Sequence, residues 1–240
     1  MSEKIDTNIR KEKKELPPKS VAIFDFDGTI SDSGEVVANI LNELADEYGY
    51  PKLSREDIAI YTNKSARRFI REDLKMSWLR LPGFAKRVRA ELNKRLPSLK
   101  PIGGMVEVVK ELKSRGYRIG IVSSNSEKNI RQFLANNDID IFDFVSSGSS
   151  IFGKGRNIGK VLMREGFRQE DVVYIGDEIR DSDAAKKVGI DVIVVSWGYN
   201  SRESLENNDT GILVDSPNQL LDLLPPKSPT PNNTERRILS

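Results

Sequence analysis

Short apolar runs rich in β-branched residues alternate along the chain with segments whose apolar residues recur at helical spacing. Uninterrupted apolar runs of this kind are typical of strands that are covered on both faces, as in a parallel sheet. Gly116, Gly166 and Gly189 follow three of the helical segments, as helix stop signals often do. The alternation therefore predicts an α/β fold, in which a doubly wound parallel sheet carries helices on both faces. The predicted strands lie at 21–24, 118–122, 142–145, 172–175 and 192–195, and the predicted helices at 103–115, 126–136, 157–166 and 180–188.

One interval breaks this alternation. Between Gly34 and Pro97 no strand-like run occurs, and the apolar residues keep a helical spacing. The interval is several times longer than the dozen or so residues that a crossover between parallel strands requires. We therefore predict a helical domain inserted into a discontinuous core domain, with polar, proline-containing flexible tails at both ends of the chain. The predicted divisions are a tail at 1–18, the core at 19–33 and 98–224, the helical insert at 34–97, and a tail at 225–240.

Polar side chains follow four of the predicted strands, at the point where each strand ends. In an open parallel sheet this edge is where ligands bind. Several carboxylates brought together there would repel one another by several kcal/mol unless cations offset the charge. A bound Mg²⁺ and a lysine would supply that compensation, and a phosphoryl group bound beside them would find a phosphoryl-transfer site. The residues are Asp25 and Asp27, then Ser123, Ser124 and Asn125, then Lys154, and finally Asp177 and Asp181.

The 240-residue chain contains no histidine and no cysteine. This composition excludes Ser-His-Asp triads, thiolate nucleophiles, disulfides and metal sites built on His or Cys. An enzyme with this composition takes its nucleophile and its proton transfers mainly from carboxylates, lysine, tyrosine or hydroxyl groups. A bound metal would be a hard cation with oxygen ligands, such as Mg²⁺.

Four motifs in this order resemble those of the haloacid dehalogenase (HAD) superfamily. They are the pentapeptide Asp25-Phe26-Asp27-Gly28-Thr29, Ser123 after an apolar strand, Lys154, and Gly176-Asp177 with Asp181 four residues beyond Asp177. Together with the helical insert, the resemblance covers residues 20–224. It implies a Rossmann-like core with an α-helical cap domain.

The resemblance also implies a role for each carboxylate. Asp25 would attack phosphorus and form an aspartyl-phosphate, and Asp27 would protonate the leaving oxygen and then activate water. Asp177 would bind Mg²⁺ together with the Asp25 carboxylate and the backbone carbonyl of Asp27. Asp181 would contact the metal directly or through a neighbouring group.

The phosphoryl oxygens would be held by Thr29, Ser123 and Lys154 according to the same resemblance, with Ser124 replacing Ser123 if the strand ends one residue later. Lys154 also completes a GxxxxGK spacing that begins at Gly148, which is typical of phosphate-binding P-loops. The next residue is Gly155, where a P-loop requires Ser or Thr for Mg²⁺, so a P-loop NTPase is disfavoured.

Position 27 distinguishes activities within the superfamily. The related dehalogenases and phosphonate hydrolases lack Asp there, whereas phosphomutases keep it but carry a His about ten residues later, where this chain has Val37. The resemblance therefore implies a phosphatase for a small phosphorylated metabolite, with phosphoglycolate as the best candidate. A nucleotide or sugar-phosphate phosphatase, a phosphomutase, and a non-catalytic interaction protein on the same fold are the alternatives.

The segment from Lys64 to Arg95 is strongly basic, with eleven Lys and Arg residues against three acidic ones. A solvated helix face explains such a segment, and so does a lid that attracts an anionic substrate. In the second case Lys64, Arg67, Arg68 and Arg71 are the candidate substrate contacts. A nucleic-acid surface is disfavoured because few aromatic residues are interleaved with the cations.

The chain has a net charge of +2, no apolar run long enough to span a bilayer, and no apolar signal segment near its first residue. We therefore expect a cytoplasmic protein without a membrane or nucleic-acid partner. Near the fourth strand, Glu178 and Arg180 are expected to cap and pair at a helix start. Trp197 and Tyr199 are expected to be packing residues.

Overall fold

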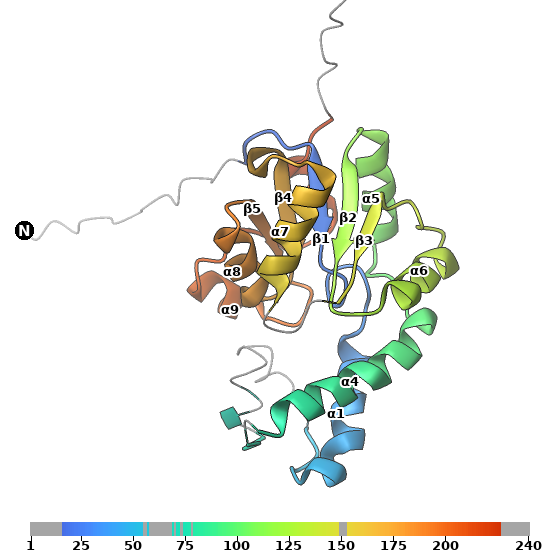
Figure 1. The fold of residues 1–240 in the computed structure, drawn as a ribbon, viewed down its shortest axis with the longest axis vertical. Coiled ribbons are helices and arrows are strands. Elements are labelled where there is room, and N and C mark those ends of the chain that lie inside the picture. Colours follow the sequence, from blue (N-terminus) through green and yellow to red (C-terminus); the bar gives the residue numbers. More distant parts are fainter. Residues whose placement is uncertain are drawn as a thin grey trace, which may run out of the picture.

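The computed structural model of the chain describes residues 16–54, 57, 69, 71–72, 74–77, 79–148 and 153–226. Its centre is a six-stranded parallel sheet with the strand order β3-β2-β1-β4-β5-β6 (Figure 1). The chain runs outward from β1 on one side and then outward from β4 on the other, which confirms the doubly wound α/β prediction. The strands are β1 (Val21–Phe24), β2 (Arg118–Val122), β3 (Phe144–Ser146), β4 (Val172–Gly176), β5 (Asp191–Val195) and β6 (Ile212–Val214).

Two strands have the bounds that the sequence predicts, and β4 and β5 are each one residue longer. The third strand begins two residues later than predicted because the Asp143 carboxylate accepts a hydrogen bond from the Ile119 backbone N–H at 2.7 Å. A strand neighbour would satisfy that N–H with a backbone carbonyl. The outermost strand, β6, was not predicted, since its three residues make too short an apolar run to stand out.

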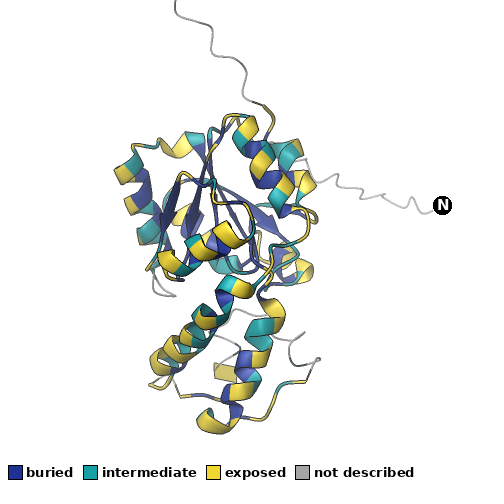
Figure 2. Ribbon diagram, turned by 90° about the vertical axis from the view of Figure 1, so that its right-hand side faces the viewer, coloured by how far each residue is buried: buried dark blue, intermediate teal, exposed yellow. Residues whose placement is uncertain are grey.

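Helices cover both faces of the sheet, as its buried strands require (Figure 2). Ala22 and Phe24 of β1 point into a hydrophobic cluster on one face of the sheet, and Val21 and Ile23 point into a second cluster on the other face. None of the described helices is long and apolar enough to cross a membrane. The helices on the sheet are α5 (Met105–Ser114), α6 (Glu127–Asn136), α7 (Lys154–Glu165), α8 (Ile179–Lys187), α9 (Arg202–Asn207) and α10 (Asn218–Leu223), with 3₁₀ turns η1 (Leu96–Ser98) and η2 (Gln169–Asp171).

The four predicted helices are all present. Three of them differ from the prediction by one or two residues at an end, whereas α7 begins three residues earlier than predicted, at Lys154. The short helices α9 and α10 were not predicted, because six residues span fewer than two turns and show little periodicity.

Two further helices, α1 (Gly34–Tyr48) and α4 (Leu81–Arg95), lie away from the sheet (Figure 1). We call these two helices the cap. They pack on each other around a hydrophobic cluster of their own, which includes Ile40, Leu44 and Phe84. Burial of such side chains stabilises a helix pair by roughly 1.5–3 kcal/mol per large side chain. The cap therefore has its own apolar contacts, and its status as a separate domain stays a prediction.

The chain enters and leaves the cap through two segments that run side by side. Ile30 accepts a hydrogen bond from the Ile102 N–H at 2.8 Å, and Asp32 donates its N–H to the Lys100 carbonyl at 2.9 Å. An antiparallel bridge joins Ser31 to Pro101 between them. These bonds hold the cap beside the carboxyl end of β1.

Candidate active site

The loop that follows β1 is held in place by its own residues. Phe26 is fully buried and packs edge-on against Phe133, with the ring centroids 5.0 Å apart. Asp25 continues the strand pairing, since its N–H donates to the Ile175 carbonyl at 2.8 Å. With the residue between them anchored in the core, Asp25 and Asp27 both lie at the carboxyl end of the sheet.

Three buried carboxylates meet beside this loop. Asp25, Asp177 and Asp181 each offer an oxygen within 4.8 Å of the others. Burial raises the pKa of Asp25, and burial together with the charges of Glu178 and Asp181 raises the pKa of Asp177 well above its ordinary value. The cluster therefore requires a cation to hold its carboxylates ionised.

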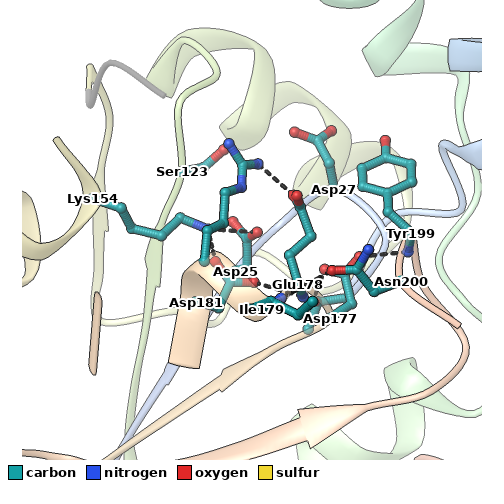
Figure 3. Close-up of polar contacts among 12 residues, drawn as sticks. Asp25, Asp27, Ser123, Lys154, Asp177, Glu178, Ile179, Asp181, Tyr199 and Asn200 are labelled. Atoms are coloured by element: carbon teal, nitrogen blue, oxygen red, sulfur yellow. Dashed lines mark hydrogen bonds and ion pairs between the residues drawn. The ribbon is translucent and has the colours of Figure 1, made fainter. Parts of the chain in front are cut away.

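Lys154, the first residue of α7, supplies one positive charge to this cluster (Figure 3). Its Nζ lies 2.7 Å from Asp25 Oδ2 and also pairs with Asp181 Oδ1. Burial alone would lower the pKa of Lys154, but the attraction of Asp181 and Asp25 raises it well above the ordinary value. One ammonium does not balance three carboxylates. The hard oxygen donors that remain fit Mg²⁺, and Asp25, Asp177 and Asp181 are the candidate ligands.

Asp177 is oriented by two donors from distant parts of the chain. Thr29 Oγ1 donates to Asp177 Oδ1 at 2.8 Å, and the Tyr199 backbone N–H donates to Oδ2 at 2.7 Å. Bonds of this kind fix a metal-binding carboxylate in one orientation. The structure thus places Thr29 against Asp177, and the predicted contact of Thr29 with phosphate stays a prediction.

Gly28 leaves room for Asp177. Its φ is +75°, and a Cβ at this position would lie 2.4 Å from Asp177 Oδ2. We expect Gly28→Ala to lower the free energy of unfolding and to weaken Mg²⁺ binding, measured by urea denaturation and by calorimetric titration.

The matched control is Gly49→Ala, because Gly49 has a φ of +74° but nothing within 4 Å of a new Cβ. This control should lose only the roughly 1–2 kcal/mol of backbone strain and keep its Mg²⁺ affinity. Equal Mg²⁺ affinity in both variants would contradict the role assigned to Gly28.

Asp27 lies apart from the three clustered carboxylates. Its Oδ2 accepts a hydrogen bond from Asn125 Nδ2 at 2.5 Å, and its buried Oδ1 has no partner among the described residues. Burial and the negative charge of Asp25 raise the pKa of Asp27 to about 7. A carboxyl group with this pKa can both give and take a proton near neutral pH.

The end of β2 supplies Ser123, Ser124 and Asn125. Ser123 is fully buried and its hydroxyl accepts the Asn125 N–H at 3.1 Å, whereas Ser124 lines a cavity beside Asp27. Both serines therefore reach the site, and the choice between them as the phosphate ligand stays a prediction. The sequence places Asn125 in a polar cluster at the end of a strand, and in the structure Asn125 is the hydrogen-bond partner of Asp27.

Glu178 and Arg180 pair and cap as predicted. Arg180 Nη2 lies 2.5 Å from Glu178 Oε1, and Glu178 forms a reciprocal capping box with Asp181 at the start of α8. In this box Asp181 Oδ2 accepts the Glu178 N–H at 3.1 Å. Asp181 is therefore held by the helix start as well as by Lys154.

A cavity of about 140 Å³ separates the cap from the carboxyl ends of the strands. Three of the predicted substrate contacts, Lys64, Arg67 and Arg68, lie outside the described residues. Arg71 is exposed, pairs with Glu72 at 3.2 Å, and is not among the described residues that line the cavity. The cavity is lined by Asp27, Val37, Leu41, Phe69, Phe84, Ala85, Val88, Arg89, Leu92, Ser124, Asn125, Glu178, Arg180 and Tyr199.

Tyr199 and Arg89 are among the lining residues that the sequence did not predict as site residues. Tyr199 was expected to be a packing residue, but it lines the cavity, and its hydroxyl lies 2.7 Å from Ser33 Oγ just before α1. Arg89 of α4 is one of eleven Lys and Arg residues between Lys64 and Arg95, and the prediction from sequence did not distinguish it from the others. A signal for it exists in the sequence, because Arg89 lies four residues after Ala85 and three residues before Leu92, which places it beside the apolar face of the helix.

Comparisons with known proteins identify the family of this chain. The family model described as "Haloacid dehalogenase-like hydrolase" matches residues 22–195. The chain is 36% identical over 200 residues to a phosphoglycolate phosphatase of Synechococcus elongatus, covering 83% of this chain and 94% of the relative. A phosphoglycolate phosphatase of Nitrosospira multiformis is 27% identical over 215 residues, with 84% and 93% covered.

A solved structure has the same fold. The haloacid dehalogenase-like hydrolase of Streptococcus pneumoniae superposes with a TM-score of 0.72 at 20% identity, covering 85% of this chain and 97% of that one. The family model and the Synechococcus relative each match most of the chain. The chain therefore belongs to the haloacid dehalogenase-like hydrolase family, as a phosphoric monoester hydrolase.

Proposed function

We propose that this enzyme is a Mg²⁺-dependent phosphatase that hydrolyses phosphoglycolate through an aspartyl-phosphate on Asp25. The observation that carries the proposal is the placement of two carboxylates at the end of β1: Asp25 beside Lys154 and the acidic cluster, and Asp27 apart from them with a pKa of about 7. The similarity to the Synechococcus phosphoglycolate phosphatase over 94% of that protein's length supports the choice of substrate.

In the first step a carboxylate oxygen of Asp25 attacks phosphorus, and the bond from phosphorus to the ester oxygen breaks. Asp27 gives its proton to the departing oxygen, so that the alcohol leaves as a neutral group. The raised pKa of Asp27 keeps a fraction of this carboxyl protonated near neutral pH, which supports its assignment as the acid.

In the second step water attacks phosphorus, and the bond from phosphorus to the Asp25 oxygen breaks. Asp27, now ionised, takes a proton from this water, and inorganic phosphate leaves. Asn125, bonded to Asp27 Oδ2, holds the carboxylate so that Oδ1 is the oxygen left for proton transfer.

Lys154 and Ser123 or Ser124 would hold the phosphoryl oxygens during both steps. Asp25, Asp177 and the Asp27 backbone carbonyl would hold Mg²⁺, with Asp181 beside them. The metal neutralises charge on the phosphoryl group when it is bound. A buried lysine that already pairs with Asp25 can donate instead to a phosphoryl oxygen placed between them.

Val37 favours a phosphatase over a phosphomutase. It occupies the position where related phosphomutases carry histidine, and it lines the cavity. An alkyl side chain cannot carry a proton, so position 37 takes no part in acid–base chemistry.

A substrate panel tests the proposed function. Purified protein with Mg²⁺ would be offered 2-phosphoglycolate, p-nitrophenyl phosphate, nucleoside monophosphates and hexose phosphates, and released phosphate would be measured. We expect the highest kcat/KM for 2-phosphoglycolate. Preferential hydrolysis of a nucleotide or a hexose phosphate would reject this substrate, and transfer of the phosphoryl group within a sugar would reject the reaction.

Chelation of divalent cations by EDTA should abolish the activity, and added Mg²⁺ should restore it. Because Mg²⁺ relieves the repulsion among the clustered carboxylates, it should also raise the melting temperature, with a stabilisation of about 2.7 kcal/mol at a hundred times its Kd. Asp177→Asn should remove this stabilisation, whereas Asp183→Asn, at an exposed position of α8, should keep it. Full activity in EDTA would contradict the metal requirement.

A further inference from the structure

The cavity between the cap and the sheet has two chemically different walls. Among the described residues, the wall on the side of the cap is apolar apart from one cation, Arg89. The opposite wall, from the core, carries Asp27 with Asn125, Arg180 and Tyr199. A substrate in this cavity therefore meets polar and charged groups of the core on one side and, among the described residues, one cation on the other. The apolar residues on this side are Val37 and Leu41 of α1, Phe84, Ala85, Val88 and Leu92 of α4, and Phe69 from the segment between the two helices.

Arg89 differs from the arginines near it on α4. Arg87 pairs with Glu91 at 3.0 Å, and Arg95 pairs with Glu43 at 2.6 Å. Arg89 is half-buried in the cavity wall and has no hydrogen bond or ion pair among the described residues. A guanidinium that has lost part of its water and gained no anion is costly, unless a ligand supplies the anion.

Arg180 adds a second guanidinium to the same cavity. Its Nη2 pairs with Glu178, but its Nε is buried and has no partner among the described residues. Burial and the positive charge of Arg180 lower the pKa of Arg89, against the opposing effect of Asp27, so the three groups are within electrostatic reach of one another. Of these two arginines only Arg180 has a carboxylate partner among the described residues, Glu178.

We infer that Arg89 and Arg180 together bind a carboxylate of the substrate, so that the enzyme selects short phosphomonoesters whose alcohol part is a carboxylic acid. This inference rests on the proposed function and gives it a physical basis for specificity. The planar fork of a guanidinium matches a carboxylate through two parallel hydrogen bonds.

The size and the apolar wall of the cavity favour the same substrate class. Its volume of about 140 Å³ is small beside the roughly 300–1,000 Å³ of pockets for larger ligands. Sugar hydroxyls placed against Val37, Leu41 and Val88 would lose their hydrogen bonds to water without replacement. A two-carbon acid presents no such hydroxyls.

The test compares one substitution on two substrates that differ in a single group. The substrates are 2-phosphoglycolate and 2-phosphoglycolamide, in which an uncharged amide replaces the carboxylate. For Arg89→Gln we expect kcat/KM for 2-phosphoglycolate to fall by about 10- to 100-fold, mainly through KM, because a charged hydrogen-bonding partner is lost. The kcat/KM for the amide should fall much less, so that the variant loses most of the preference for the acid. Arg89→Lys should keep part of it.

The matched control is Arg87→Gln, on the same helix, whose side chain is 46% exposed and is not among the described residues that line the cavity. This variant should have the wild-type kcat/KM for both substrates and therefore the wild-type ratio. If Arg89→Gln lowered kcat/KM equally for the acid and for the amide, so that their ratio stayed the same, the inference would be overturned. A higher kcat/KM for a short bisphosphate than for 2-phosphoglycolate would also overturn it, since the second anion would then be a phosphate.

Failure of the inference and failure of the proposed function give different results. A wild type that hydrolyses phosphoesters but does not prefer the acid over the amide refutes the carboxylate site alone. A wild type without any phosphatase activity refutes the proposed function. In that case calorimetric titration with 2-phosphoglycolate still decides: weaker binding to Arg89→Gln than to the wild type supports the carboxylate site, and equal binding overturns it.

Discussion

Replacing Asp25 by Asn is expected to abolish turnover, with kcat for 2-phosphoglycolate falling by on the order of 10⁴-fold or more. The amide keeps the size of the side chain, but its oxygen is a poor nucleophile and cannot form the aspartyl-phosphate. The substitution also removes the carboxylate that lies 2.7 Å from Lys154. Phosphate release by purified protein measures the rate. Mass spectrometry of acid-quenched samples should find the phosphoryl group on the Asp25 peptide of the wild type alone.

Asp183→Asn is the control for this experiment. It makes the same chemical change at an exposed position on α8, two residues beyond Asp181, and should leave the rate unchanged. Circular dichroism should show that both variants are folded. An Asp25→Asn enzyme that kept a substantial part of the wild-type rate, or a phosphoryl group found on another residue, would show that the nucleophile lies elsewhere.

Replacing Asp27 by Asn should slow the reaction by about 10²- to 10⁴-fold, the usual contribution of a general acid and base. The loss should depend on the leaving group. The alkoxide of glycolate requires a proton when it departs, whereas p-nitrophenolate leaves without one. With p-nitrophenyl phosphate the substitution should therefore slow the first step less than the second, because in the second step water must lose a proton to residue 27.

The expected signature of Asp27→Asn is a burst of p-nitrophenol followed by slow turnover, with phosphorylated Asp25 accumulating. Rapid-quench measurements would detect both. Asp32→Asn, at an exposed position on the way to the cap, provides the control and should show wild-type kinetics. Equal losses on both substrates without any phosphoenzyme would contradict the role of Asp27 as acid and base.

Local sequence patterns predicted five of the six strands because these strands coincide largely with continuous apolar runs. Val21–Phe24 and Arg118–Val122 were predicted with the observed bounds, since both faces of these strands are buried and no polar residue interrupts their buried stretch. The strand at Phe144–Ser146 was misplaced because a side chain, Asp143, takes over a backbone hydrogen bond, and residue type alone does not reveal this. The edge strand β6 was missed because it is short.

The carboxylates at the strand ends were also visible in the sequence, because a residue that follows a parallel strand must lie at one edge of the sheet. The hydrogen bonds that hold these carboxylates in place could not be predicted from the sequence. Thr29 and Asp177 are 148 positions apart, and their hydrogen bond depends on β1 and β4 being neighbours in the sheet. The bonds from Asn125 to Asp27 and from Tyr199 to Asp177 likewise join loops after different strands.

The sequence by itself determined the chemistry of this protein: the absence of histidine and cysteine restricts it to carboxylates, lysine and hydroxyl groups, and the motif order assigns those groups to strand ends. The tertiary structure alone decided the surroundings of each group. Burial raises the pKa of Asp27 to about 7, and the packing of α4 over the strand ends brings Arg89 to the cavity while Arg71 stays exposed. The physical reason is that desolvation and charge interactions depend on distances between residues far apart in the chain, which local patterns do not specify.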